Sequence, residues 1–386
     1  MAARSPSPRS AEPRRTGIPA MPAVAYLDWN ATAPLSPAAR DALLASLGQV
    51  GNPSSVHAFG RAARRVVEDA RVAVAALVGA DPDGVIFTSG GTEANALALA
   101  GARCAVAVSD VEHASVLAAR EDAARVPVDG DGRVAVERLD ALLRARGPAL
   151  VSVMAANNET GTVQPIDAIA ACVQAHGGIL HCDAVQAAGR LPVDMARQGI
   201  GMLTLSAHKL GGATGVGALV VRGAARPGAL IRGGGQEQGA RAGTENVAGI
   251  AAFGAAARAA AAEQARAARV GALRDRMEDA LCQAVPATRI LARRAPRLPN
   301  TSCVALPGFD SATIVMAMDL AGIAISAGAA CSSGKVRPSH VLAAMGVPAD
   351  IAGAAVRVSL GSTTTEEEVD RFVRAWSSLA TRRAAA

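Results

Sequence analysis

The sequence of 386 residues is poor in lysine and in aromatic residues. Lys and Arg together number 39, but only Lys209 and Lys335 are lysines, so arginine carries almost all of the positive charge. Phe, Trp and Tyr make up 2% of the chain. Hydrophobic residues still make up 51% and charged residues 19%, which excludes a largely disordered chain and predicts a globular protein. At this length we expect a large domain accompanied by a smaller one.

The chain also has no long apolar run and no paired cysteines. The longest uncharged apolar run, residues 247–257, is well short of the roughly 20 residues that span a bilayer, so we expect no transmembrane helix and no membrane partner. The six cysteines show neither Cys-x-x-Cys pairs nor zinc-type histidine spacing, and we expect reduced thiols in a cytoplasmic protein. Most of them should be small buried residues.

Residues 1–20 contain no apolar stretch and are rich in Pro, Ser and Arg, which predicts a disordered N-terminal extension without a secretory signal. This extension carries a net charge of +3, half of the formal +6 of the chain. The isoelectric point of about 9.4 is therefore weak evidence for nucleic-acid binding, and we predict no nucleic-acid partner.

Short apolar segments alternate with helical or polar segments in the first two thirds of the chain. This alternation is typical of an α/β domain with a mainly parallel sheet, whose ligands bind beyond the carboxyl ends of the strands. The predicted strands are residues 85–87, 105–108, 150–154, 179–181, 202–205 and 218–221.

The last third predicts a smaller α/β domain. An alanine-rich stretch at 250–285 predicts one long helix with a bend near Gly271, and strands are expected at 302–306, 323–326 and 355–360. We place the large domain at 36–250 and form the small domain from 21–35 together with 251–386.

Lys209 stands at the end of a predicted strand, in the sequence Ser206-Ala-His208-Lys209. Lysine can lose its proton near neutral pH when its surroundings favour it, whereas arginine cannot. Such an amine is what Schiff-base formation with a carbonyl requires, including the carbonyl of pyridoxal phosphate. A lysine that only caps a strand is an equally good interpretation on position alone.

Other polar residues follow further predicted strands. The glycine-rich turn at 88–93 opens a helix and predicts a phosphate cradle, and His113, Asn158, Asp183 and Gln186 also follow strands. Each residue alone is more often a turn or cap residue. Their occurrence at successive strand ends favours a common site.

Two residues near the C-terminus add further chemistry. Cys331 lies among glycine, alanine and serine, which predicts a mobile, exposed loop, and its thiolate would be a nucleophile. Arg357 lies in a short alternating strand, where its planar guanidinium would suit a carboxylate. A solvated strand arginine is the more common interpretation of Arg357.

The chain resembles the group I cysteine desulfurases of the nitrogen-fixation and iron–sulfur-cluster type, which belong to the class V aminotransferase family. The resemblance covers residues 24–375. It depends on ordered motifs: Tyr-Leu-Asp-Trp-Asn-Ala-Thr at 26, Gly-Asn-Pro-Ser-Ser at 51, Thr-Ser-Gly-Gly-Thr-Glu at 88, Ala-Asn-Asn-Glu-Thr-Gly at 156, Asp-Ala-Val-Gln at 183, Ser-Ala-His-Lys at 206, Arg-Ala-Gly-Thr-Glu-Asn at 241, Ala-Cys-Ser-Ser-Gly at 330 and Arg-Val-Ser-Leu-Gly at 357.

The resemblance implies the pyridoxal-phosphate transferase fold of type I, with a mainly parallel seven-stranded sheet in the large domain and a smaller α/β domain. It implies that Lys209 binds the cofactor covalently, that His113 stacks on its ring and that Asp183 pairs with the ring nitrogen. It implies that Asn158 and Gln186 contact the side of the cofactor ring that carries the hydroxyl group. It assigns the phosphate to Gly91, Thr92, Ser206 and His208, with Thr244 contributed by the other subunit of a homodimer.

The resemblance further implies the substrate and the reaction. Arg357, with Asn158, would bind the carboxylate of L-cysteine, and Cys331 would accept its sulfur as a persulfide while alanine is released. The sulfur would pass to an acceptor or iron–sulfur scaffold protein. A class V aminotransferase or selenocysteine lyase, and a non-catalytic scaffold that binds sulfur-transfer partners, remain alternatives.

Overall fold

The computed structural model describes residues 24–223, 225–328 and 338–384, so the predictions for residues 1–20 and for Cys331 lie outside the described residues. A seven-stranded sheet forms the centre of the larger part, with strand order β2-β8-β7-β6-β5-β3-β4. β8 pairs antiparallel with both of its neighbours, and the other described pairs are parallel. The strands are β2 (Val85–Thr88), β3 (Val106–Ser109), β4 (Ala124–Val126), β5 (Leu150–Met154), β6 (Ile179–Asp183), β7 (Met202–Ser206) and β8 (Gly217–Val221).

This sheet confirms the predicted α/β fold with a mainly parallel sheet. Every predicted strand is present to within a few residues, because strands buried on both faces are continuous apolar runs. No strand was predicted at β4, whose three residues include the exposed Arg125 and carry no apolar run.

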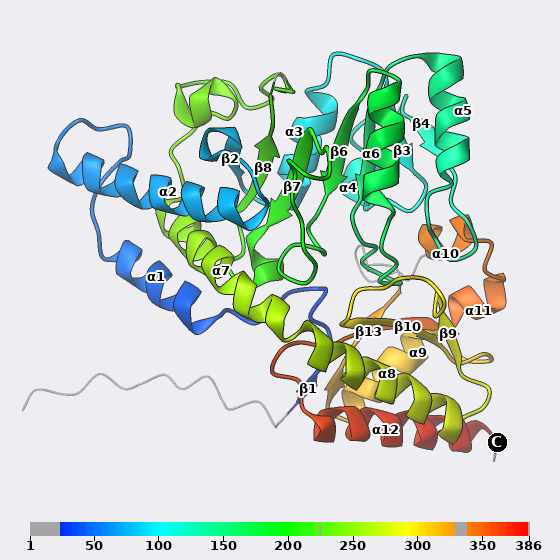
Figure 1. Ribbon diagram of the computed structural model, residues 1–386. Helices are drawn as coiled ribbons and strands as arrows, with labels where there is room; N and C mark the ends of the chain where they lie inside the picture. The colour runs from blue at the N-terminus through cyan, green and yellow to red at the C-terminus, as the bar shows by residue number, and fades with distance from the viewer. Residues whose placement is uncertain (1–23, 224, 329–337, 385–386) are drawn as a thin grey trace, which may run out of the picture.

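Helices cover both faces of this sheet (Figure 1). Phe87 packs on the face covered by α2, α5, α6 and α7, whereas its neighbour Ile86 packs on the face covered by α3. Ser36 caps α1 by accepting a hydrogen bond from the Ala39 amide, and Pro37 follows it at the first helical position. The helices of this part are α1 (Pro37–Leu47), α2 (Ala58–Leu77), α3 (Gly91–Ala100), α4 (Ala114–Leu117), α5 (Val136–Arg146), α6 (Ile166–Ala175) and α7 (Val247–Ala265).

A second core lies below the large sheet in Figure 1 and contains Phe372 and Trp376. Its four-stranded antiparallel sheet has the order β12-β13-β10-β9, and β1 pairs in parallel with β11. Ala25 and Leu27 belong to this core, which agrees with assigning the N-terminal segment to the small domain, although the domain limits stay a prediction. The elements are β1 (Ala25–Tyr26), α8 (Ala267–Ala284), β9 (Arg289–Leu291), β10 (Thr301–Ala305), α9 (Ser311–Leu320), β11 (Ile323–Ala324), β12 (Ser326–Ala327), α10 (His340–Ala344), α11 (Ala349–Gly353), β13 (Ala355–Ser359) and α12 (Glu366–Ala384).

Two elements, one helix and one strand, were wrongly predicted to be continuous. The long helix at 250–285 is two helices, and the break lies at Arg266 rather than near Gly271. α7 packs against α1 and α2, whereas α8 packs against α12, so the chain passes from one core to the other at this break. The strand at 323–326 is likewise divided, because β11 pairs with β1 and β12 pairs with β13.

We expected no transmembrane helix. In the part of the chain that the structure describes, no helix is long and apolar enough to cross a bilayer.

A buried ion pair fastens α2 to the segment that follows β8. The two guanidinium nitrogens of Arg71 donate to the two carboxylate oxygens of Glu237 at 2.9 and 3.0 Å, and the Phe87 amide donates to the same carboxylate at 2.9 Å. Both side chains are almost fully buried. Glu237 has a φ of +48°, a left-handed conformation that the surrounding contacts must maintain.

Replacing Arg71 should therefore be strongly destabilising. Arg71→Met would leave the Glu237 carboxylate buried without its counter-ion, and we expect a loss of about 3–5 kcal/mol in the free energy of unfolding. Arg40→Met is the matched control, because Arg40 pairs with Asp41 at the surface and should cost less than about 1 kcal/mol. Urea titration of both variants measures the difference, and equal losses would contradict this role for the pair.

Candidate functional site

A cavity of about 420 Å³ opens at the carboxyl ends of β5, β6 and β7. Arg357 reaches it from β13, so both cores contribute to its walls. It brings together ten of the predicted site residues: Gly91, Thr92, His113, Asn158, Asp183, Gln186, Ser206, His208, Lys209 and Arg357.

Two predicted site residues are not among its lining. Thr244 is exposed and borders a separate cavity of about 130 Å³ next to Thr88 and Ser89. Cys331 lies outside the described residues.

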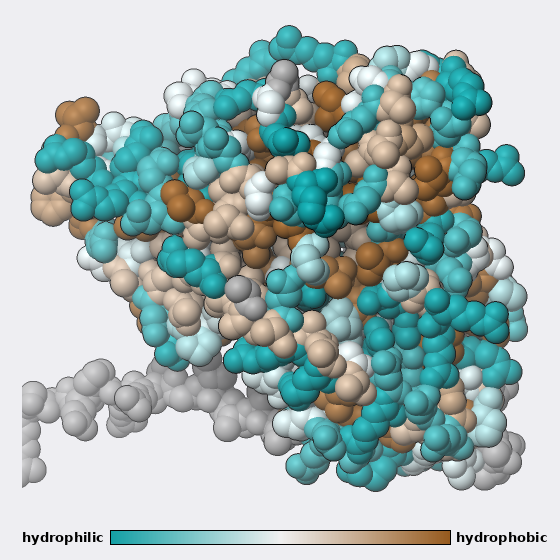
Figure 2. Space-filling view, viewed as in Figure 1, coloured by the Kyte–Doolittle hydropathy of each residue, from teal (hydrophilic) through white to brown (hydrophobic). Residues whose placement is uncertain are grey.

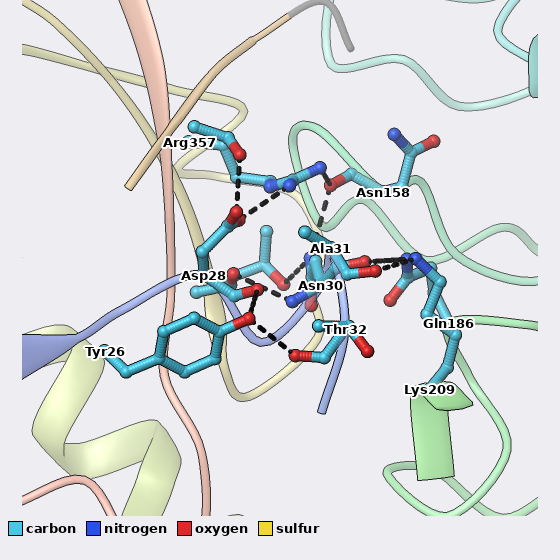
Figure 3. A network of polar contacts seen from close by, with 12 residues as sticks. Tyr26, Asp28, Asn30, Ala31, Thr32, Asn158, Gln186, Lys209 and Arg357 are labelled. Atoms are coloured by element: carbon cyan, nitrogen blue, oxygen red, sulfur yellow. Dashed lines mark hydrogen bonds and ion pairs between the residues drawn. The ribbon is translucent and has the colours of Figure 1, made fainter. Parts of the chain in front are cut away.

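Lys209 follows β7 in a short 3-10 turn, and its amine points into the cavity (Figure 3). Its Nζ donates to the carbonyl oxygens of Asn30 at 2.6 Å and of Ala31 at 2.7 Å. Burial, with the nearby positive charges of Arg357 and Arg190, lowers the pKa of Lys209 to about 8. About a tenth of the amines are then uncharged at pH 7, far more than for an ordinary lysine.

Asp183 is the last residue of β6 and is a buried residue of the cavity lining. Its Oδ2 accepts from Asn95 Nδ2 at 2.8 Å, and its Oδ1 accepts from the Val185 amide at 3.0 Å. Asn95 was not predicted, although it follows Thr92 by three residues and so lies on the same face of α3. Asn95 Oδ1 is buried without a hydrogen-bond partner among the described residues.

His113 caps α4 at the edge of the cavity. Its Nδ1 accepts from the Ser115 amide at 3.1 Å, which places the ring proton of the neutral imidazole on Nε2. Burial lowers the pKa of His113, and this favours the neutral ring. A neutral aromatic ring can stack on a flat ligand without bringing a charge.

Arg357 is buried, so the interpretation as a solvated strand arginine is wrong. Its Nη2 donates to Asp28 Oδ1 at 2.8 Å and its Nη1 to the Asn158 carbonyl at 3.2 Å. Its Nε is buried without a partner in the described part of the chain. Asp28 is held in turn by Ser326 Oγ, which donates to Oδ2 at 2.7 Å.

The segment around Asp28 and Asn30 is the largest feature of the site that the sequence did not assign (Figure 3). The Asn30 carbonyl accepts from Lys209 and also from Gln186 Nε2 at 3.0 Å. Asn30 Nδ2 donates to the Asn158 carbonyl at 3.2 Å. The only sequence signal was the motif at 26–32, since these residues lie more than 100 positions from their partners.

The start of α3 forms an anion cradle. Gly90 precedes the helix without a side-chain cap, so the first helical N–H groups remain available at the positive end of the helix dipole. A Cβ on Gly91 would lie 3.1 Å from Val185 Cγ2 and 3.5 Å from Ser206 Cβ, which leaves little room for a larger residue. Burial and Lys209 lower the pKa of His208 to about 4, so His208 serves this site as an uncharged ring.

These groups fit pyridoxal phosphate. An anion cradle at α3 suits the phosphate, the buried carboxylate of Asp183 suits the pyridine nitrogen, and the amine of Lys209 suits the aldehyde. The unpartnered Asn95 Oδ1 and Arg357 Nε leave hydrogen-bonding capacity inside the same cavity.

α10, the first described helix after residues 329–337, is tied to two loops of the site. Ser339 Oγ donates to Glu159 Oε2 at 2.6 Å, and His340 Nε2 lies 2.9 Å from the carbonyl oxygen of Glu112, next to His113. Burial raises the pKa of Glu159 to about 7. Ser339, at the start of α10, is therefore fastened to the loop that carries Asn158.

Comparison with known proteins agrees with this geometry. The model of the family described as Aminotransferase class-V matches residues 25–372. A protein of Cereibacter sphaeroides named cysteine desulfurase is 47% identical over 364 residues, covering 90% of this chain and 93% of its own. A solved NifS-like protein of Rickettsia africae has a TM-score of 0.86 at 31% identity, covering 93% and 99%. A solved structure named SspA in complex with cysteine has a TM-score of 0.75 at 26% identity, covering 88% and 99%.

The lowered pKa of Lys209 predicts the pH dependence of its covalent reaction with pyridoxal phosphate. Only the uncharged amine attacks an aldehyde, so in the apoprotein the rate should rise about tenfold from pH 7 and level off above pH 8 to 9. Arg190→Met removes one positive charge near the amine, which should raise the pKa of Lys209 and move the profile to higher pH.

Stopped-flow absorbance of the reaction checks this prediction. Arg289→Met, which changes the exposed first residue of β9, is the control that should keep the wild-type profile. A wild-type rate that still climbs at pH 10, as for a solvated lysine, would count against a lowered pKa.

Proposed function

Because the chain belongs to the class-V aminotransferase family and is a pyridoxal-phosphate-dependent cysteine desulfurase, we propose that Lys209, His113 and Cys331 are its catalytic residues. The observation that carries this assignment is the Lys209 amine, whose pKa is about 8, in one cavity with Asp183 and Arg357. The cavity would thereby bring together an amine that binds the cofactor covalently, a carboxylate that pairs with its ring and a guanidinium that binds the substrate carboxylate.

The bound cofactor supplies an electron sink for the bond cleavage at the substrate. Asp183 would accept the hydrogen bond of the protonated ring nitrogen and keep that proton in place. His113 would contact the ring, and Gln186 and Asn158 would orient its hydroxyl side. The α3 amides at Gly91 and Thr92, with Ser206 and His208, would hold the phosphate.

The substrate is oriented by its carboxylate. Arg357 already points its guanidinium toward the cavity, and Asp28 fixes the plane of that group. A carboxylate meeting this planar fork can be bound through two parallel hydrogen bonds, which positions the rest of L-cysteine. Asn158 lies beside Arg357 and completes the substrate site.

The sulfur passes to Cys331. Lys209 takes the α-proton of the substrate, the thiolate of Cys331 attacks the substrate sulfur, and the carbon–sulfur bond breaks. The electron pair left on carbon receives a proton, so L-cysteine and one thiol give L-alanine and one persulfide. No external oxidant is consumed.

A homodimer would complete the phosphate site through Thr244. Arg241 pairs with Glu93 at 2.9 Å, which holds the segment of Thr244 beside the start of α3 but leaves Thr244 exposed. Hydrophobic surface lies at the projecting end of α2 (Figure 2), and exposed apolar side chains also line α1. Such a surface supports contact with a second copy.

We also propose a partner for the persulfide and a location for the protein. The persulfide would be consumed by a sulfur-acceptor or iron–sulfur scaffold protein, in the cytoplasm, without nucleic acid or membrane as partner. The relatives named cysteine desulfurase support the reaction class and leave the acceptor open.

Product analysis tests the proposed reaction. With L-cysteine and a reducing thiol, the holoenzyme should release alanine and sulfide in equal amounts. Cys331→Ser should lower sulfide release by at least 100-fold, because no thiol is left to accept the sulfur. Cys104→Ser, which removes an exposed cysteine, should leave the rate unchanged. Full sulfide release by Cys331→Ser would instead indicate a lyase, whereas transamination without sulfide release would indicate an aminotransferase.

Mixed dimers test the contribution of Thr244. Lys209→Ala and Thr244→Val should each inactivate a homodimer or weaken its cofactor binding. A co-expressed mixed dimer contains one Lys209→Ala subunit and one Thr244→Val subunit. One of its sites would combine the intact Lys209 of the Thr244→Val subunit with the intact Thr244 of the Lys209→Ala subunit. About half of the wild-type activity per dimer should then return, whereas no recovery would show that Thr244 serves its own subunit.

A further inference from the structure

Three side chains that the proposed reaction does not use converge between α5 and α6. Asp140 lies on α5, Cys172 lies on α6, and His176 directly follows α6. One ligand atom of each, a carboxylate oxygen, the thiol sulfur and an imidazole nitrogen, lie within 4.8 Å of one another. All three residues are half-buried.

This cluster could not be found from the sequence for two reasons. Most of the cysteines were expected to be small buried residues, which holds for Cys182 and Cys303, whereas Cys172 is half-buried and Cys104 is exposed. Zinc-type spacing was also expected along the chain. Cys172 and His176 are one helical turn apart, but the third group comes from another helix.

The geometry already orients two of the three groups. Asp140 Oδ1 lies 2.8 Å from His176 Nε2, so the imidazole faces the carboxylate across the two helices. Arg144 Nη2 donates to the other oxygen, Oδ2, at 2.6 Å. A cation bound through Oδ1 would thus find a carboxylate whose second oxygen is held by a neighbouring side chain, as is common around metal sites.

We propose that Asp140, Cys172 and His176 form a binding site for a borderline divalent metal ion such as Zn²⁺. A thiolate, an imidazole and a carboxylate together favour Zn²⁺ or Co²⁺ over Mg²⁺ and Ca²⁺, which prefer oxygen ligands. Three protein ligands leave a fourth tetrahedral position for water.

Small side-chain movements suffice to admit the ion. Ligand atoms at about 2.0–2.3 Å from a tetrahedral metal lie about 3.5 Å apart. The oxygen of Asp140 and the nitrogen of His176 must separate by less than about 1 Å from their 2.8 Å contact. Cys172 binds as its thiolate and releases one proton to solvent. The ion would link α5 to α6 on the outside of the large sheet.

Metal titration of the holoenzyme tests this site. Because Cys331 could also bind a thiophilic metal, the measurements use the Cys331→Ser background. Co²⁺ is the probe, since its visible absorption reports tetrahedral coordination, and native mass spectrometry counts the bound ions. We expect one Co²⁺ per protomer, displaced by Zn²⁺, and a rise in thermal midpoint when Zn²⁺ is added.

Two variants and one control identify the ligands. Cys172→Ser and His176→Gln should each weaken Co²⁺ binding at least tenfold and abolish the rise in thermal midpoint. Cys282→Ser removes another half-buried helical cysteine and should leave both unchanged. Absence of a bound ion, or equal binding by all three variants, would overturn the proposal. The readouts do not involve sulfur release, so they are independent of the proposed function.

Discussion

The site depends on the contact between Lys209 and the chain segment at 30–31. The amine donates to two backbone carbonyls of this segment, while Asp28, two residues earlier, pairs with Arg357. The segment thereby joins a residue that follows β7 of the seven-stranded sheet to a residue of β13 in the four-stranded sheet. Without it, the Lys209 amine and the Arg357 guanidinium would belong to separate cores.

The same arrangement explains the electrostatics of the cavity. Lys209 shares a buried space with Arg357 and Arg190, and these cations, together with burial, favour its uncharged form. The carboxylates of Asp28 and Asp183 act in the opposite direction on the pKa of Lys209. Asp28 accepts a hydrogen bond from the Arg357 guanidinium, and Asp183 accepts one from Asn95. The cavity thus holds an amine of lowered pKa, two carboxylates and a guanidinium that come from different elements of the fold.

Features of the fold and the site that depend on a local sequence pattern could be predicted, whereas features that depend on residues distant in sequence could not. The strands of the large sheet were found because burial on both faces makes them continuous apolar runs, but β4 was missed because three residues carry no such run. The break at Arg266 was misplaced because it reflects a change of packing partner rather than a glycine. Asn95, Asp28 and Glu159 were not assigned, since each is defined by a partner distant in sequence.

The sequence by itself determined the chemical groups of the site: a rare lysine, a carboxylate, an anion-binding helix start and ordered motifs that indicated the family. Residue type and local spacing are sufficient for these conclusions. Only the tertiary structure decided that Arg357 is buried and paired with Asp28, and that Lys209 donates hydrogen bonds to the carbonyls of residues 30–31. It also decided that Thr244 does not line the cavity that contains Lys209. Those facts depend on distances between residues far apart in the chain, and such distances are set by how the two cores pack together.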